Sequence, residues 1–417
     1  MANKVLDPVR RPPRRVPLAE RIGVAWFDDP ERPGAGWACV QGTEPRRIDG
    51  PQALALDYTW ATNWVGQPGP PPYGSHVRDE HFLGVALGAL ADQWGLGASR
   101  QDVAPSDRVA VLAELARRLV NLVTRHYGEP VTGDGRLRMP ASLFDWVRDA
   151  LRHKSPPTPM GSIEADQALR GAYLLEHISP IDPDYRTQAV EFLFPRARYA
   201  QMLLGLRGPA AGSTFEPYRG LVPRGYSEPG PTGEIYRFLS GLASRQPALV
   251  ELHFKTTDRT VGALMGPVSR HRLRTWFAAE EAAQLAAYGQ VAVRRVFVAE
   301  QYSPLGAGAL ALPREGQAGE VAPSYGVLSE LHWRALADPN IGTGEAVAHS
   351  TGPMPARAVW VATWDRLLCL QAALAFHAKG LQVSRYGQGR VSVQVPFDGP
   401  ETAAAVMDRF CLQVARL

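Results

Sequence analysis

The strongest local pattern in the chain is a long segment that has clear start and stop residues. Residues 356–379 follow a proline and end at Gly380, as expected for a helix. Two strand-like runs come next, Leu381–Tyr386 and Val391–Val395, and the Gly-Gln-Gly-Arg between them predicts a β-hairpin. A long helix that leads directly into a hairpin predicts a mixed α+β or α/β fold.

Length and composition limit the classes of protein. The chain has 417 residues, which predicts two or three domains or one large multi-part fold. Its apolar fraction of 45% excludes a wholly disordered protein. There is no run of eighteen apolar residues and no secretory core at the N-terminus, so we expect no membrane span and a cytoplasmic location. Three distant cysteines argue against a disulfide scaffold and a cysteine-type zinc site.

Arginine supplies nearly all of the positive charge. Lys and Arg total 45 against 41 acidic residues, and only four of these cations are lysines. The bias reflects either high-GC codon usage or a need for guanidinium groups that bind phosphate. Residues 1–20 include Arg-Arg-Pro-Pro-Arg-Arg and predict a flexible basic arm that could contact nucleic acid.

Apolar periodicity divides the rest of the chain into two predicted domains, 21–155 and 162–417, separated by a proline-rich break. The first should contain strands at Ile22–Phe27 and Trp37–Val40 and helices at Phe82–Gly95, Val109–His126 and Pro140–His153. The second should begin with a helix at Glu164–Leu175 and then contain a strand at Ala248–Lys255, a helix at Thr275–Tyr288 and a strand at Val291–Ala299.

The common catalytic motifs are absent from the sequence. There is no phosphate-binding loop, no Gly-x-Ser-x-Gly elbow and no Gly-x-Gly-x-x-Gly turn. The ten histidines form no His-x-x-x-His pair. We therefore predict no bound cofactor.

Several segments between residues 107 and 398 match one family in order and spacing. Val190-Glu191-Phe192-Leu193-Phe194-Pro195 is similar to Asp-x-x-Ser-Leu-Tyr-Pro, and the hairpin at Gly387–Arg390 is similar to Tyr-x-Asp-Thr-Asp-Ser. Arg138–Leu143 and Leu169–Tyr173 also match segments that lie between the exonuclease and palm motifs. Together these segments resemble a family B DNA polymerase of the protein-primed type.

The resemblance implies a particular fold. A degenerate exonuclease domain of the ribonuclease H-like class would be followed by a palm-like domain at 162–417. The fingers insertion, about 303–355, is short, and about twenty residues remain for a thumb. The lysine expected to meet a nucleoside triphosphate is missing, because no lysine occurs between 256 and 378.

The positions that would hold the catalytic metal ions have lost their acids. A polymerase palm needs carboxylates to bind two Mg²⁺ ions. The matching positions here are Ala189, Gln388 and Arg390, and Glu191 is two residues away from the first of them. We therefore predict no catalytic residue and no metal site in the palm. These changes favour a protein that is not an enzyme.

Asp29 and Glu31 have the Asp-x-Glu spacing of the first nuclease motif of the family. Pro30 lies between them, so a surface turn is the simpler interpretation. The later acidic position of the family is Arg108 here, and Asp107 is one residue away.

Five residues of the matched segments are candidate DNA contacts: Arg170, Tyr173, Arg385, Tyr386 and Arg390. Arginine can bind backbone phosphates and tyrosine can stack on bases. Arg390 would either enter the vacated metal site and meet a phosphate, or pair with a neighbouring carboxylate.

Three functions follow from these observations. The first is an inactive polymerase-like protein that binds DNA in a replication, mobile-element or defence complex with other protein subunits. The second is a protein scaffold without DNA contact, which the modest net charge of +4 favours. The third is a residual metal-dependent nuclease that uses Asp29 and Glu31.

Overall fold

The computed structural model describes most of the chain. The described residues are 17–40, 42–55, 57–64, 82–83, 87–97, 102–130, 143–154, 161–180, 186–266, 268–269, 272–306, 322–338, 354–397 and 400–414. The chain divides into two compact units, 1–146 and 147–417, and the boundary falls inside helix α3 (Leu143–Lys154). Most of the predicted basic arm and of the Arg138–Leu143 match, and parts of the fingers insertion, lie outside the described residues.

Unit 1 is built on a five-stranded sheet in the order β3-β2-β1-β4-β5. Strand β2 is antiparallel to β1 and β3, whereas β1, β4 and β5 are parallel. The predicted pairing of the first two strands is confirmed, with Gly23 opposite Val40. Phe27 and Trp60 are buried in its core. The strands are β1 (Ile22–Phe27), β2 (Gly36–Val40), β3 (Arg46–Ile48), β4 (Thr59–Thr62) and β5 (Phe82–Leu83).

Helix α2 (Pro105–Tyr127) packs against β1 and β2 through the predicted apolar stripe, which includes Val109 and Leu112. The expected helix at Phe82–Gly95 is partly wrong, because its first two residues form β5 and the helix α1 spans Leu87–Gln93. The arm is also shorter than expected. Leu18–Arg21 forms a 3₁₀ turn with Leu18 buried.

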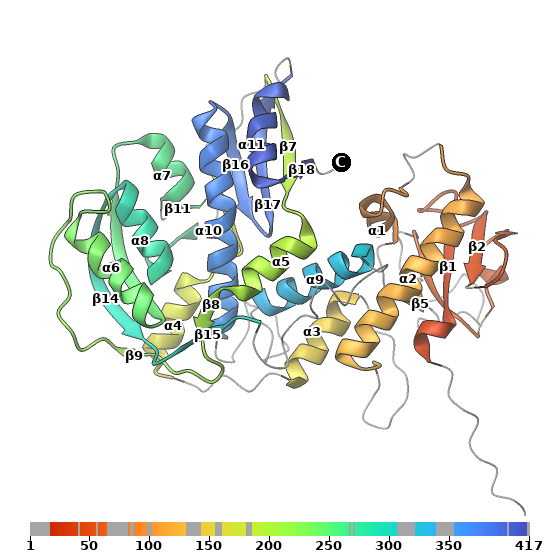
Figure 1. Cartoon of the computed structure of the whole chain (residues 1–417), viewed down its shortest axis with the longest axis horizontal. Helices are drawn as coiled ribbons and strands as arrows, with labels where there is room; N and C mark the ends of the chain where they lie inside the picture. Colours follow the sequence, from red (N-terminus) through yellow and green to blue (C-terminus); the bar gives the residue numbers. More distant parts are fainter. Residues whose placement is uncertain are drawn as a thin grey trace, which may run out of the picture. The chain divides into compact units, whose positions relative to one another are not determined.

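Unit 2 contains a five-stranded antiparallel sheet in the order β18-β7-β17-β16-β6. The predicted hairpin is confirmed as β16 and β17, and the predicted long helix as α10 (Ala356–Ala378). This helix packs along β16 and β17 (Figure 1). Its Phe376 stacks on Phe192 of β7. The strands are β6 (Glu176–Ile178), β7 (Thr187–Leu193), β16 (Gln382–Gly387), β17 (Arg390–Pro396) and β18 (Gln413–Val414).

A four-stranded sheet, β13-β10-β14-β9, forms the second layer of unit 2 and packs against α6 and α8. The predicted strands are confirmed as β10 (Ala248–Lys255) and β14 (Gln290–Val298). The expected helix at Thr275–Tyr288 is wrong at its start. Trp276–Ala278 forms β13 because it pairs with β10, and α8 covers Ala279–Tyr288.

Shorter elements complete unit 2. The helices are α4 (Ile163–Ala172), α5 (Arg196–Gly205), α6 (Glu234–Arg245), α7 (Arg259–Met265), α9 (Ala322–Ala337) and α11 (Ala404–Phe410). The remaining strands are β8 (Arg207–Pro209), β9 (Glu216–Pro217), β11 (Val268–Ser269), β12 (Arg272–Leu273) and β15 (Tyr302–Pro304).

A buried ionic junction connects α4, α8 and α10. Glu281, in the first turn of α8, accepts two hydrogen bonds from Arg274 at 2.9 and 2.8 Å and one from Arg366 of α10 at 2.7 Å. The two guanidinium groups also donate to the carbonyl oxygens of Ala172, the last residue of α4, and of Leu174, two residues beyond it. The junction therefore fixes both layers to the same central helix.

Among the described residues, α10 is long and apolar enough to cross a membrane by length and composition alone. However, 72% of its apolar window is buried inside the protein, as expected for a core helix.

Candidate functional site

One face of the β18-β7-β17-β16-β6 sheet carries a cluster of charged side chains. Arg385 of β16, Ser392 of β17 and Glu191 of β7 lie in a row, because Ser392 is opposite both of the others in the sheet register. Arg385 donates to Glu191 and, at 2.9 Å, to the Ser392 hydroxyl. Arg390 lies 3.5 Å from Glu191 and 3.6 Å from Glu176 of β6. We call Glu176, Glu191, Arg385, Arg390 and Ser392 the palm-face cluster.

A β-bulge brings Arg385 into this cluster. The register shifts between Val383 and Arg385, so that Arg385 lies opposite Ser392. In a regular strand, residues two apart face the same side, and Arg385 would share the buried face of Val383. The bulge turns the arginine to the other face, which is the usual effect of an extra residue in one strand.

The cluster does not suit a pair of catalytic metal ions. Mg²⁺ needs oxygen ligands around an open position, but each carboxylate here already faces two guanidinium groups. A dication would have to displace both arginines. Across the described residues, no three His, Cys, Asp or Glu side chains come together in a way that could hold a metal ion.

A buried carboxylate on α10 binds the backbone at the tip of the hairpin. Asp365 of α10 accepts the backbone N–H groups of Gln388 and, at 2.8 Å, Gly389, together with the Tyr199 hydroxyl at 2.5 Å. Burial raises the pKa of Asp365 to about 6, although these three donors oppose the rise. Gln388 has a φ of +56°, a left-handed conformation that costs about 1–2 kcal/mol for a residue with a side chain.

Ala189 and Arg390, two of the three positions that replace acids, are not adjacent. Ala189 lies opposite Gln394, whereas Arg390, at the hairpin tip, lies opposite Leu193. Four residues of strand separate the two pairs, or about 13 Å. Glu191 is therefore the acid of β7 that reaches the hairpin arginines.

Both tyrosines expected to stack on DNA are in the core, which corrects that expectation. Tyr173 is 7% exposed, and its hydroxyl donates to the carbonyl oxygen of Ala337 at 2.9 Å. Tyr386 is 5% exposed, stacks on His177 and donates to the carbonyl oxygen of Leu264. Each hydroxyl finds a backbone acceptor, which is what a buried tyrosine needs.

The predicted arginines have carboxylate partners. Arg170 pairs with Asp166 at 2.6 Å, one helical turn away. Arg390 pairs with Glu176 and Glu191, which agrees with the ion-pair alternative considered for it. The side chains of Arg385 and Arg390 remain 37% and 30% exposed, so an incoming anion can reach both.

The Asp29–Glu31 pair lies in the turn between β1 and β2. Asp29 accepts the backbone N–H groups of Glu31 at 2.9 Å and Arg32 at 3.2 Å, which is the behaviour of a turn-forming aspartate. Arg108, which replaces the later acid, is buried with its guanidinium 5.5 Å from the centre of the Trp26 ring.

Sequence reasoning missed Glu176, Ser392 and Asp365. One signal was available: Asp365 and Arg366 are adjacent charges inside an apolar helix, and such charges are almost never fully buried unless paired. Glu176 had no local signal, because it joins the cluster only through the pairing of β6 with β16.

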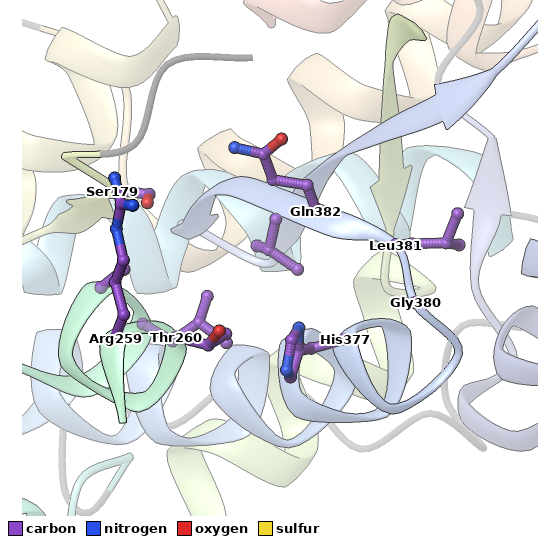
Figure 2. Close-up of a pocket in the computed structure, with 10 residues that line it drawn as sticks. Ser179, Arg259, Thr260, His377, Gly380, Leu381 and Gln382 are labelled. Carbon is purple, nitrogen blue, oxygen red and sulfur yellow. The ribbon is translucent and has the colours of Figure 1, made fainter. Parts of the chain in front are cut away.

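Figure 2 shows a separate pocket of about 420 Å³ beside the hairpin layer, lined from α7, the end of α10 and the start of β16. Arg259 and Thr260 lie across the pocket from His377. No member of the palm-face cluster lines it.

No protein-family model and no curated protein matches the chain. Among solved structures, the chain is similar to phi29 DNA polymerase complexed with primer-template DNA, at 9% identity and a TM-score of 0.43, over 92% of this chain and 81% of that one. The phi29 enzyme complexed with single-stranded DNA matches at 10% identity and a TM-score of 0.38, over 93% and 70%.

Proposed function

We propose that this protein binds DNA through a polymerase-like palm but does not transfer nucleotides, and that it acts as a component of a larger complex. Two arginines lie between two glutamates in the palm-face cluster, and this observation carries the proposal. The site is arranged for an anion to exchange with a carboxylate, and a metal pair would have no free carboxylate ligands there.

The arrangement of the strands supports the polymerase-like assignment. Strand β7 pairs with β17 of the hairpin, and α10 leads into β16, as the motif order in the sequence predicts. In unit 1, the order β3-β2-β1-β4-β5 with only β2 antiparallel is the arrangement expected of a ribonuclease H-like sheet.

Primer extension tests the loss of nucleotidyl transfer. A primed template with deoxynucleoside triphosphates and either Mg²⁺ or Mn²⁺ should give no extended product. Extension that Glu191→Ala abolishes would refute the proposal, because a palm carboxylate would then be holding a metal.

A double variant tests the DNA contact. Glu176→Gln with Glu191→Gln removes the acids that compete with phosphate for Arg385 and Arg390. Duplex affinity should rise, and the slope of log K against log salt should steepen by up to about 1.8 if two phosphates are engaged. Glu114→Gln is the matched control, because Glu114 also lies between two arginines, on α2. An unchanged slope in the double variant would refute palm-face binding.

A scaffold without DNA contact is the second candidate. The two glutamates already neutralise the two arginines, so the cluster has no excess charge to attract DNA from a distance. In that case neither the wild-type protein nor the double variant should bind duplex DNA at low salt.

A further inference from the structure

An ordered loop of unit 2 projects from the outer edge of β14 (Figure 1, the green segment between β9 and α6). Tyr218 donates its backbone N–H to Val296 at 2.9 Å, and Ser227 donates its own to Val291 at 3.1 Å. The two acceptors are five residues apart on β14, a distance of about 17 Å. The nine residues of the loop between the two donors would reach about 30 Å if fully extended. The loop must therefore bow outward, and Leu221 within it is 95% exposed.

Further contacts fix the base of this loop. The Tyr218 ring packs edge-to-face against Phe238 of α6, with centroids 6.0 Å apart. Gly230 donates its N–H to Ala286 of α8 at 3.0 Å. The loop is therefore ordered before any partner arrives, which lowers the entropy cost of binding.

Three arginines of this edge are exposed. Arg219 and Arg224 lie on the loop, and Arg294 lies on β14 beside it. The register between β10 and β14 shifts at Glu251, which leaves Arg294 as the extra residue of a bulge. In the part of the chain that the structure describes, none of the three makes an ion pair or a side-chain hydrogen bond.

This part of unit 2 also carries exposed tyrosines. The Lys255 ammonium is 4.3 Å from the centre of the Tyr226 ring, and Tyr226 is 45% exposed. Lys255 is opposite Gln290 in the sheet, two residues after Tyr288, which is 44% exposed. Tyr226 therefore has exposed ring surface beside a positive charge.

Positive charge is in excess on this surface. Its cations are Arg219, Arg224, Lys255, Arg294 and Arg295. The nearby acids are Glu216, Glu228 and Glu251 on the same segments and Glu164, whose charge acts on Arg295. Glu251 is already paired with Arg295 at 2.7 Å. The unpaired arginines suit backbone phosphates, and exposed aromatic faces suit unstacked bases, which a duplex does not offer.

We infer that this edge, defined by Arg219, Arg224, Tyr226, Lys255 and Arg294, binds single-stranded nucleic acid. The inference rests on the proposed function for its choice of nucleic acid as partner, but it uses a surface that shares no residue with the palm-face cluster. The arginines would hold successive phosphates while Tyr226 stacks on a base. The edge would thereby hold a strand outside the palm.

Salt-dependent binding of a fluorescent oligothymidylate to the full-length protein tests the inference. Arg219→Gln, Arg224→Gln and Arg294→Gln together should reduce the slope of log K against log salt by about 2, since each single-strand phosphate contact contributes about 0.7. Arg32→Gln, Arg125→Gln and Arg409→Gln form the matched control, because they remove the same charge from exposed arginines on other elements. Tyr226→Ala should weaken binding about tenfold and Tyr226→Phe should not, because a phenyl ring also stacks.

Photocrosslinking of a bromodeoxyuridine oligonucleotide gives an independent readout, with the crosslink expected in the peptide that contains Tyr226.

Competition with single-stranded RNA and with duplex DNA separates the ligands: either single strand should compete and the duplex should compete poorly. If oligothymidylate binds with an unchanged slope in the triple variant, the edge inference is wrong while DNA binding stands. If neither single-stranded nor duplex DNA binds the wild-type protein at low salt, both proposals are wrong. If a protein partner binds this edge and no nucleic acid binds it, the inference is also wrong.

Discussion

Replacing Glu281 with glutamine should destabilise unit 2 more than any single surface change. The carboxylate is shared by Arg274 and Arg366, whose side chains are 4% and 2% exposed. Although burial opposes it, the two guanidinium groups lower the pKa of Glu281 to about 2. A fall from 4.5 to about 2 corresponds to about 3 kcal/mol of stability at neutral pH. Removing one partner of a buried ion pair costs a similar 3–5 kcal/mol.

The assay is thermal unfolding of the wild-type protein and Glu281→Gln at several pH values. At pH 7 the melting temperature of unit 2 should fall by about 10 °C, given about 2–4 °C per kcal/mol for a unit of this size. Glu251→Gln is the control, because its partner Arg295 is 53% exposed and such pairs contribute about 0–1 kcal/mol.

The pH dependence has a definite sign. Because folding lowers this pKa, the stabilisation is present above about pH 4.5 and is lost as the pH falls toward 2. The wild-type protein and Glu281→Gln should therefore become equally stable near pH 2. A melting temperature within 2 °C of the wild type at pH 7, or a difference that persists unchanged at pH 2, would refute the reasoning.

Two further predictions concern stability. Asp365→Asn should remove a pH dependence. Because folding raises the pKa of Asp365 from 3.8 to about 6, the wild-type protein should lose about 2 kcal/mol relative to the variant as the pH rises from 4 to 6.5, measured by urea unfolding. Equal pH profiles would contradict this. Gly23→Ala should destabilise unit 1 by about 1–3 kcal/mol, because the new methyl group would lie 2.6 Å from the Trp60 ring. Gly241→Ala, in α6, meets nothing within 4 Å and should stabilise its helix by about 1 kcal/mol, which makes it the control for the same substitution.

Elements with strong local signals could be predicted from the sequence. The helix at 356–379 and the hairpin after it have a proline, glycines and β-branched runs in the expected places, and α10, β16 and β17 agree with the prediction within a few residues. Strands β5 and β13 could not be predicted, because two or three residues become a strand only when a neighbour pairs with them.

The palm-face cluster was only partly predictable. Arg385 and Arg390 follow from the hairpin motif, but Glu176 enters through a long-range strand pairing. The bulge that turns Arg385 to the open face depends on how β16 aligns with β17, which local sequence does not encode. The same limit explains Tyr173 and Tyr386, whose burial depends on packing from distant segments.

The position of α10 in the chain has a consequence during synthesis. The helix is apolar on nearly every side, and strands β16 and β17, which cover it, are translated after it. While those strands are still inside the ribosome, the emerging chain carries an apolar helix with the composition of a membrane segment, and part of its apolar surface has no packing partner yet. Nascent chains of this protein should therefore recruit chaperones that shield apolar helices until the final hairpin emerges.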